Sequence, residues 1–209
     1  MMKKATAARH PVSRKFKLLC SCIRDFCRGV DFTVPDRMYD RGRNDGAMYY
    51  ATPQKLLQEI FGCIDPAGFP NFLDIGCGKG FVLWKAWEYG FQRVGGIDFD
   101  EKMIQICQRN LQKLGLEKAI QPVFGDACQF DRYADYDIFY FYNPFPAATM
   151  ASVIQQIIAQ CKGKEIRIVY FRPRYPEAIE SSGLFECRHT FRDKDTGYIA
   201  NVYHGIIPR

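Results

Sequence analysis

A glycine-rich stretch, FLDIGCGKGF at residues 72–81, is the part of the sequence best suited to hold a ligand. It begins with apolar residues typical of a strand and continues through Asp74 to Gly76, Gly78 and Gly80. Glycines let the backbone turn sharply and approach a ligand without intervening side chains. A helix beginning here would direct its first N–H groups at an anion. The stretch therefore predicts a ligand-binding turn between a strand and a helix.

Two further acids stand at the ends of predicted strands. Asp98 closes the run VGGID, about twenty residues after the glycine-rich turn, where a carboxylate can accept two hydrogen bonds from a ribose diol. Asp100 directly precedes the next helix and is the better candidate for its cap. Asp126 in GDA can accept a hydrogen bond from an adenine amino group, while the N–H of Ala127 donates to the ring. Acids at three successive strand ends predict a nucleoside-binding site.

Two common phosphate-binding motifs do not match this turn. The dinucleotide motif G-x-G-x-x-G requires a third glycine at the position of Phe81, and the P-loop string G-x-x-x-x-G-K-[ST] is absent. These mismatches disfavour a dinucleotide site and exclude a P-loop.

The elements that must position these residues follow a regular pattern from about residue 70. Strands are predicted at NFLDIG, RVGGID, AIQPVFGDA, DYDIFYFYNPF and EIRIVYF, and most of them are followed by helical periodicity. Continuous apolar strands alternating with helices are typical of a parallel sheet covered on both faces. The last segment, LFECRHTFRDKDTGYIANVYHGI, predicts an antiparallel hairpin. In an open parallel sheet, ligands bind at the carboxyl edge, where the glycine-rich turn and the acids would meet.

The region before this core is less regular. Residues 31–53 mix turn formers with tyrosines, and we expect Tyr49 or Tyr50 to belong to a segment that closes over the site. Thr52 and Pro53 have the cap and first-turn chemistry of a helix start.

The first thirty residues carry most of the net charge of +6, because eight basic residues stand there against Asp25 alone. Apolar residues recur among them at intervals of three and four, which predicts a basic amphipathic helix from about Arg14 to Val30. Three interpretations remain open: a helix docked on its own domain, which we favour, a surface for an acidic partner or nucleic acid, and a helix lying in a membrane interface.

Composition bounds the class of protein. The chain has 209 residues, of which 47% are hydrophobic and 25% charged, as expected for one globular domain with a short appendage. No apolar run approaches the roughly 20 residues of a membrane span, and no signal-peptide core follows the basic start, so we expect a cytoplasmic protein. Nine cysteines without paired CxxC spacing predict reduced thiols, and the cluster Cys20, Cys22 and Cys27 is a weak metal candidate, so no metal is expected.

Taken together, the motifs resemble those of the class I S-adenosylmethionine-dependent methyltransferases over about residues 47–209. LDIGCGKG is similar to the first motif of that family, GIDFD to the second, GDA to the third and FYNPF to the fourth. YATPQKLL and the aromatic FYNPF further resemble a group of small bacterial members. The resemblance implies an α/β, Rossmann-like, mostly parallel sheet of seven strands in the order 3-2-1-4-5-7-6, with helices on both faces and a C-terminal antiparallel hairpin. Residues 1–46 would form the basic helix and an irregular cover segment.

The same resemblance implies S-adenosylmethionine as the cofactor. Asp74 and the three glycines of the turn would frame its methionine moiety, Asp98 its ribose, and Asp126 with Ala127 its adenine. The full set of expected cofactor-binding residues is Asp74, Gly76, Gly78, Gly80, Asp98, Phe99, Asp126, Ala127 and Asn143. The catalytic candidates are Asn143 and Tyr142.

The fourth motif raises the question of the methyl acceptor. In amine methyltransferases with an N-P-P-[FY] motif, the asparagine amide and the following carbonyl hold the target nitrogen beside the aromatic ring. Asn143 and Pro144 match that motif, but Phe145 replaces its second proline, which leaves the acceptor open. Strand alternation places Tyr140 and Tyr142 on one face of their strand, either as core residues or beside the site.

These observations lead to one hypothesis and two alternatives. The hypothesis is methyl transfer to an amine on a protein lysine or a small molecule, with Asn143 positioning the acceptor; a nucleic-acid acceptor would depend on the basic N-terminal segment. Because the donor is already activated, alignment and exclusion of water can supply most of the catalysis, up to roughly 7–11 kcal/mol. The alternatives are a nicotinamide-dependent oxidoreductase and a nucleoside-binding protein without turnover.

Overall fold

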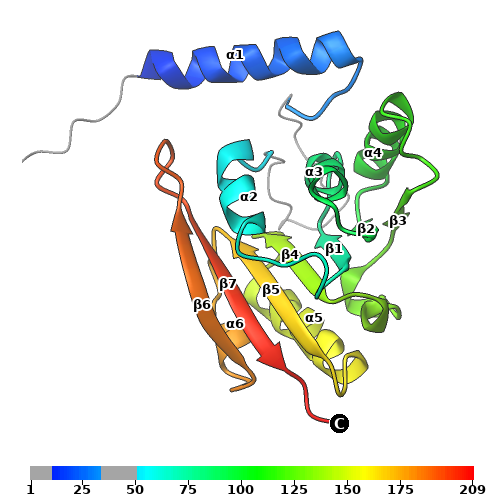
Figure 1. The fold of residues 1–209 in the computed structure, drawn as a ribbon, viewed down its shortest axis with the longest axis vertical. Helices are drawn as coiled ribbons and strands as arrows, with labels where there is room; N and C mark the ends of the chain where they lie inside the picture. Colours follow the sequence, from blue (N-terminus) through cyan, green and yellow to red (C-terminus); the bar gives the residue numbers. More distant parts are fainter. Residues whose placement is uncertain (1–10, 34–50) are drawn as a thin grey trace, which may run out of the picture.

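The computed structural model describes residues 11–33 and 51–209 and contains one seven-stranded sheet in the order β3-β2-β1-β4-β5-β7-β6 (Figure 1). Strands β1 to β5 are parallel, and β7 runs antiparallel to both β5 and β6. The strand bounds are β1 Asn71–Ile75, β2 Arg93–Asp98, β3 Ile120–Phe124, β4 Ile138–Tyr142, β5 Glu165–Phe171, β6 Phe185–Arg192 and β7 Ile199–Ile206. The predicted fold class, strand order and closing hairpin are confirmed.

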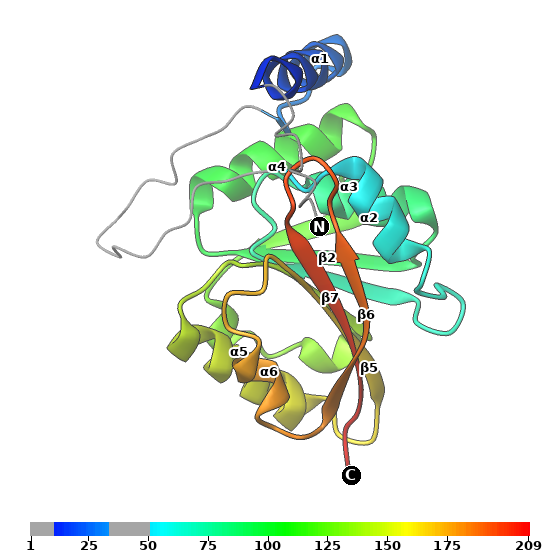
Figure 2. The ribbon, with the colours of Figure 1, turned by 90° about the vertical axis from the view of Figure 1, so that its left-hand side faces the viewer.

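Helices cover both faces of the sheet (Figure 2). The helix bounds are α1 Pro11–Arg28, α2 Gln54–Phe61, α3 Phe81–Tyr89, α4 Glu101–Lys113, α5 Ala147–Gln160 and α6 Glu177–Glu180, with short 3₁₀ turns η1 Ala127–Gln129 and η2 Tyr133–Asp135. Helices α2, α3 and α4 pack in one apolar core, and α5, α6 and the two 3₁₀ turns pack in the other. The site must therefore open at an edge of the sheet, because both faces are filled.

Strand β4 shows how the sequence builds these two cores. Its side chains alternate, so that Tyr140 and Tyr142 belong to the core on one face and Phe139 and Phe141 to the core on the other. The predicted alternation is confirmed, and aromatic side chains that bury large apolar areas anchor the centre of the sheet on both sides.

Helix starts were predicted with mixed success. The carboxylate of Asp100 accepts hydrogen bonds from the backbone N–H groups of Lys102 and Met103, at 2.9 and 3.3 Å, and so caps α4 as expected. The expectation that Thr52 caps α2 is wrong. Helix α2 begins at Gln54 with Pro53 as its N-cap residue, and the hydroxyl of Thr52 lies 2.8 Å from that of Tyr140, buried in the domain.

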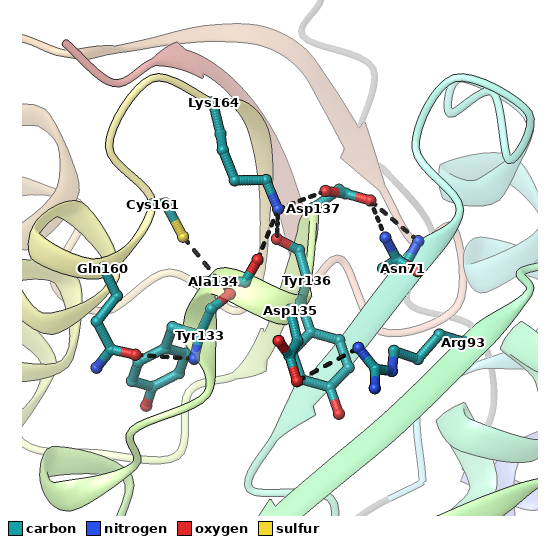
Figure 3. A network of polar contacts seen from close by, with 10 residues as sticks. All are labelled: Asn71, Arg93, Tyr133, Ala134, Asp135, Tyr136, Asp137, Gln160, Cys161 and Lys164. Atoms are coloured by element: carbon teal, nitrogen blue, oxygen red, sulfur yellow. Dashed lines mark hydrogen bonds and ion pairs between the residues drawn. The ribbon is translucent and has the colours of Figure 1, made fainter. Parts of the chain in front are cut away.

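A cluster of polar contacts connects the parallel strands at their amino ends, opposite the carboxyl ends (Figure 3). The amine of Lys164 donates to the backbone carbonyls of Ala134 and Tyr136 and lies 2.8 Å from a carboxylate oxygen of Asp137. The other oxygen of Asp137 accepts hydrogen bonds from the backbone and side-chain N–H groups of Asn71. The cluster joins the starts of β1, β4 and β5, and so fixes the strands whose far ends carry the candidate site.

Helix α1 lies at the outer edge of the molecule in both views (Figures 1 and 2). It is present as predicted, over Pro11–Arg28 rather than from Arg14 to Val30. The favoured interpretation, that its apolar face docks on its own domain, is wrong: Leu19, Ile23 and Phe26 are 57%, 53% and 85% exposed. No described helix is long and apolar enough to cross a membrane. The cover segment, with Tyr49 and Tyr50 and the expected domain boundary at residues 46 and 47, lies outside the described residues.

Candidate active site

An open cleft of about 1020 Å³, its open mouth included, lies at the carboxyl ends of the parallel strands. The predicted site residues that line it are Asp74, Gly76, Gly78, Asp98, Phe99, Asp126, Ala127, Tyr142 and Asn143. The structure thus brings together side chains from the ends of β1, β2, β3 and β4. Gly80, also predicted to bind the cofactor, is not among the residues that line the cleft.

The glycine-rich turn is held in a conformation that requires glycine. Gly76 and Gly80 have positive φ angles of 84° and 82°. A Cβ atom on Gly76 would lie 2.8 Å from the side chain of Pro144, and one on Gly80 would collide with the sulfur of Cys107 on α4. Gly76 therefore permits close contact between the turn and the fourth motif, whereas Gly80 lets the start of α3 pack against α4.

The carboxylate of Asp98 is buried beneath the turn. One oxygen accepts a hydrogen bond from the N–H of Gly78 at 2.8 Å, and the other accepts one from the N–H of Asp100 at 2.9 Å. Burial raises the pKa of Asp98 to about 6, although hydrogen bonds from backbone N–H groups act in the opposite direction. Since a carboxylate has about four acceptor sites, it retains acceptor capacity for a ligand hydroxyl.

Asp74 is buried in the same cleft. Burial raises the pKa of Asp74 well above its usual range, and the nearby charge of Asp98 raises it further. Among the described residues, neither carboxylate forms an ion pair with a basic side chain. Two buried acids without a cation create an environment that a positively charged ligand would stabilise.

Asp126 occupies the corresponding place at the end of β3. One of its oxygens accepts a hydrogen bond from the N–H of Cys128 at 2.9 Å, which makes Asp126 the cap of η1. The carbonyl of Ala127 accepts a hydrogen bond of 2.7 Å from the buried hydroxyl of Tyr133. These contacts fix the floor of the cleft at the position where the sequence predicts that an adenine binds.

The ends of β4 and β5 form the other side of the cleft. Asn143 and Arg172 are the only residues other than glycine with positive φ in the described part of the chain, at 42° and 52°, and both line the cleft. They follow Tyr142 and Phe171, which are paired in the sheet. Positive φ is uncommon for residues other than glycine, although asparagine tolerates it better than arginine, and such residues concentrate at functional sites because the surrounding structure must hold them there.

The sequence analysis did not predict that Arg172 lines the cleft. Its guanidinium stacks on the ring of Tyr198 at 4.2 Å from the centroid. The backbone N–H of Arg172 donates to the carbonyl of Ile199 at 2.7 Å. Within the described residues it forms no ion pair. The available signal was its position directly after the strand EIRIVYF, at the same edge as the acids.

A second missed feature is a buried lysine inside the glycine-rich turn. Lys79 is fully buried, and its amine lies 2.8 Å from a carboxylate oxygen of Asp31, a residue 48 positions earlier. Asn110 of α4 joins the two: its amide oxygen accepts from the N–H of Asp31 at 2.8 Å, and its amide nitrogen donates to the carbonyls of Asp31 and Lys79, both at 2.9 Å. The segment after α1 is thereby tied to the turn.

Phe32 completes this connection. Its side chain is fully buried and stacks on Trp84 of α3 at 5.3 Å, with the edge of Phe81 at 5.7 Å. We refer to residues 31–32, which join α1 to the domain through these contacts, as the strap. Aromatic contacts of this kind contribute roughly 0.5–1.5 kcal/mol beyond the area that they bury.

Comparison with known proteins agrees with this arrangement. Residues 72–163 match the family model described as "Methyltransferase domain". This segment runs from β1 to just past α5, so the chain is similar to methyltransferase domains over the strands that form the cleft, and solved methyltransferases with bound S-adenosyl-L-homocysteine share its fold. The narrower likeness to members with an aromatic-NPF motif stays a prediction.

Two curated relatives share part of the methyltransferase domain. The ribosomal protein L11 methyltransferase of Alteromonas mediterranea is 31% identical over 109 residues, which are 52% of this chain and 36% of the relative. The rRNA N(6)-adenosine-methyltransferase metl-5 of Caenorhabditis elegans is 32% identical over 81 residues, 37% of this chain and 38% of the relative. The chain thus spans well under half the length of each relative.

Solved structures share the fold at low identity. An RNA methyltransferase from Salinibacter ruber in complex with S-adenosyl-L-homocysteine has a TM-score of 0.57 at 16% identity and covers 76% of this chain and 94% of its own. Magnesium protoporphyrin IX methyltransferase from Synechocystis PCC 6803 with bound SAH has a TM-score of 0.57 at 15% identity, with coverage of 73% and 82%. Both likenesses concern the architecture of the methyltransferase domain.

Proposed function

We propose that the protein transfers a methyl group from S-adenosylmethionine to a nitrogen that Asn143 positions in the cleft. The observation that carries the proposal is the convergence of Asp98, Asp126 and Asn143, from the ends of three strands, on one cleft beside a glycine-rich turn. The match of residues 72–163 to the methyltransferase domain supports this proposal over a nicotinamide-dependent oxidoreductase.

The residues that line the cleft fit this cofactor. Asp98 has acceptor sites left for a ribose diol, and Gly76 and Gly78 open space for a methionine chain beside the turn. The buried carboxylates of Asp74 and Asp98 suit the positive charges of a sulfonium and an ammonium group. When bound, S-adenosylmethionine supplies a methyl group that is already activated for transfer.

The task of the chain is then orientation and exclusion of water. Asn143 directly follows β4 and has a positive φ, which sets the direction of its side chain. The side-chain oxygen of Asn143 accepts a long hydrogen bond of 3.5 Å from the hydroxyl of Tyr170, so it can still accept a hydrogen bond from the N–H of a substrate. Tyr142 and Phe145 provide aromatic walls on the same side of the cleft. A neutral amine already carries its nucleophilic lone pair, so a general base is not required.

The cation of Arg172 favours one kind of acceptor over another. It lies at the strand end beside that of Asn143 and is held by stacking on Tyr198. A guanidinium here repels the protonated amine of a lysine and attracts a phosphate or carboxylate. We therefore favour a nitrogen whose carrier bears an anionic group. The two curated relatives, a ribosomal protein L11 methyltransferase and an rRNA N(6)-adenosine-methyltransferase by name, support a macromolecular carrier.

A labelled-methyl screen tests the proposal. The purified full chain is incubated with methyl-labelled S-adenosylmethionine and separate RNA, protein, lipid and small-molecule fractions of a cell extract. We expect label in a phosphate-bearing fraction. For Asn143→Ala we expect about a hundredfold lower turnover at saturating cofactor, because misplacement of a reactant by about 1 Å costs that much.

Three results would contradict the proposal. Cofactor binding without transfer to any fraction would favour the nucleoside-binding alternative, and selective binding of a nicotinamide dinucleotide would favour the oxidoreductase. Full turnover of Asn143→Ala would remove Asn143 from the mechanism.

A further inference from the structure

Helix α1 exposes a row of large apolar side chains. Leu19, Ile23 and Phe26 follow one another at helical spacing, so they lie on one face, and each is more than half exposed. Arg24 and Arg28, also exposed, lie away from this row. Monomeric proteins rarely expose contiguous apolar rows of this kind unless the surface binds something.

The orientation of α1 directs this row away from the domain. The guanidinium of Arg28 lies 5.7 Å from the centroid of the Trp84 ring, and the strap packs Phe32 on the same ring. The basic side of the last turn therefore faces the domain. Figures 1 and 2 show the domain on one side of α1 only, so an extended flat surface can reach the apolar row without meeting the sheet or its helices.

Charge and apolarity together select the occupant of this face. A second copy of the chain would bring two N-terminal segments with eight basic residues and one acid each into contact, and their charges would repel. An RNA would pair with the basic residues but leave the apolar row in water. An anionic bilayer satisfies both features: acyl chains take up the apolar row, and the headgroups attract the basic residues.

We propose that α1 lies in the interface of an anionic phospholipid bilayer, with Leu19, Ile23 and Phe26 inserted at the boundary of headgroups and acyl chains. Arg24, which is exposed, can extend beside the helix toward the phosphates, as long basic side chains do at interfaces, whereas Arg28 stays against the Trp84 ring. The strap then holds the methyltransferase domain at the membrane surface. The inference is independent of the identity of the methyl acceptor.

Vesicle co-sedimentation of the full chain tests this inference. We expect binding to phosphatidylcholine vesicles that contain phosphatidylglycerol, weak binding to pure phosphatidylcholine, and loss of binding at high salt. Replacing Leu19, Ile23 and Phe26 by Glu should weaken binding more than about tenfold, because the apolar row is removed and its surroundings become acidic. Phe26→Ser alone, at the most exposed position, should weaken it several-fold.

A matched control separates the apolar row from net charge. Gln58, Gln92 and Gln112 are exposed residues of the domain, and their joint replacement by Glu changes the net charge by the same amount. This variant should keep most of the binding, since its charges lie outside α1. Unchanged affinity for S-adenosylmethionine in every variant shows that the domain remains folded.

Four results would overturn the inference. They are no binding to the anionic vesicles, equal binding by the wild type and the α1 triple variant, a dimer that the triple variant dissociates, and RNA binding that the triple variant abolishes in the absence of vesicle binding.

Discussion

We expect cofactor binding to depend on pH because of two properties of Asp98. Its carboxylate is positioned to accept hydrogen bonds in the cleft, and burial raises the pKa of Asp98 to about 6. Below that pH the carboxyl is protonated and loses acceptor capacity toward a ribose diol. The ionised form therefore favours the cofactor, and the protonated form favours the protein without it.

We predict that the affinity for S-adenosylmethionine falls by up to about tenfold between pH 7 and pH 5, because one pH unit below a pKa leaves about a tenth of the group ionised. Isothermal titration calorimetry across this range measures the effect. Asp98→Asn should bind more weakly at pH 7 and show a flat profile. Parallel profiles for the two proteins would assign the pH dependence to another group.

Residue-scale features were predictable where the signal is local. The glycine-rich turn, the acids at the strand ends and the cap by Asp100 each depend on a few neighbouring residues, and the structure places all of them at the expected elements. The pairing of Lys79 with Asp31 was not predictable, because it joins residues 48 positions apart across a segment without regular pattern. Thr52 was misjudged for a related reason: its partner, Tyr140, belongs to a distant strand.

At the scale of elements, the strap connects α1 to the glycine-rich turn that we propose binds the cofactor. Lys79 is fully buried and its amine lies 2.8 Å from a carboxylate oxygen of Asp31, while Asn110 bonds to the backbone of both. Removing one charge of such a pair destabilises the fold, because the buried partner loses part of the interaction that compensates its desolvation. The side chain of Asp31 is 41% exposed, which moderates the cost.

We predict that Asp31→Asn lowers the free energy of unfolding by about 1–3 kcal/mol, less than a fully buried pair would lose. It should also weaken cofactor binding, because Lys79 lies within the glycine-rich turn. Chemical denaturation and calorimetry measure the two effects.

Glu88→Gln is the matched control, since Glu88 pairs with Lys85 at the same distance of 2.7–2.8 Å on the surface of α3. An exposed pair should contribute less than about 1 kcal/mol. Equal effects of the two substitutions would show that the strap does not position the turn.

The helical period of the N-terminal segment predicted α1 but not its surroundings. Periodicity reports that one face is apolar and says nothing of what covers it. The sheet shows the same limit. The pattern of strands and helices predicted that both faces are covered, but it did not predict that Arg172 lines the cleft, because the only signal for Arg172 is its position after a strand.

At the scale of the whole molecule, the basic charge and the candidate site lie in different parts of the chain. The basic residues gather in the N-terminal segment, whereas the domain that follows is close to neutral and carries the cleft. If α1 binds an anionic surface, the strap keeps the domain near that surface. This would raise the local concentration of any acceptor found there without altering the chemistry in the cleft.

Binding of S-adenosylmethionine to the purified chain, compared with Asp98→Ala at pH 7, tests the central claim most directly. We predict saturable binding at one site per chain, weakened at least about tenfold when the carboxylate that we propose binds the ribose is removed, since hydrogen bonds to charged groups contribute about 1.5–3 kcal/mol. No measurable binding by the wild-type chain, or equal affinity in the two proteins, would contradict the assignment of the cleft.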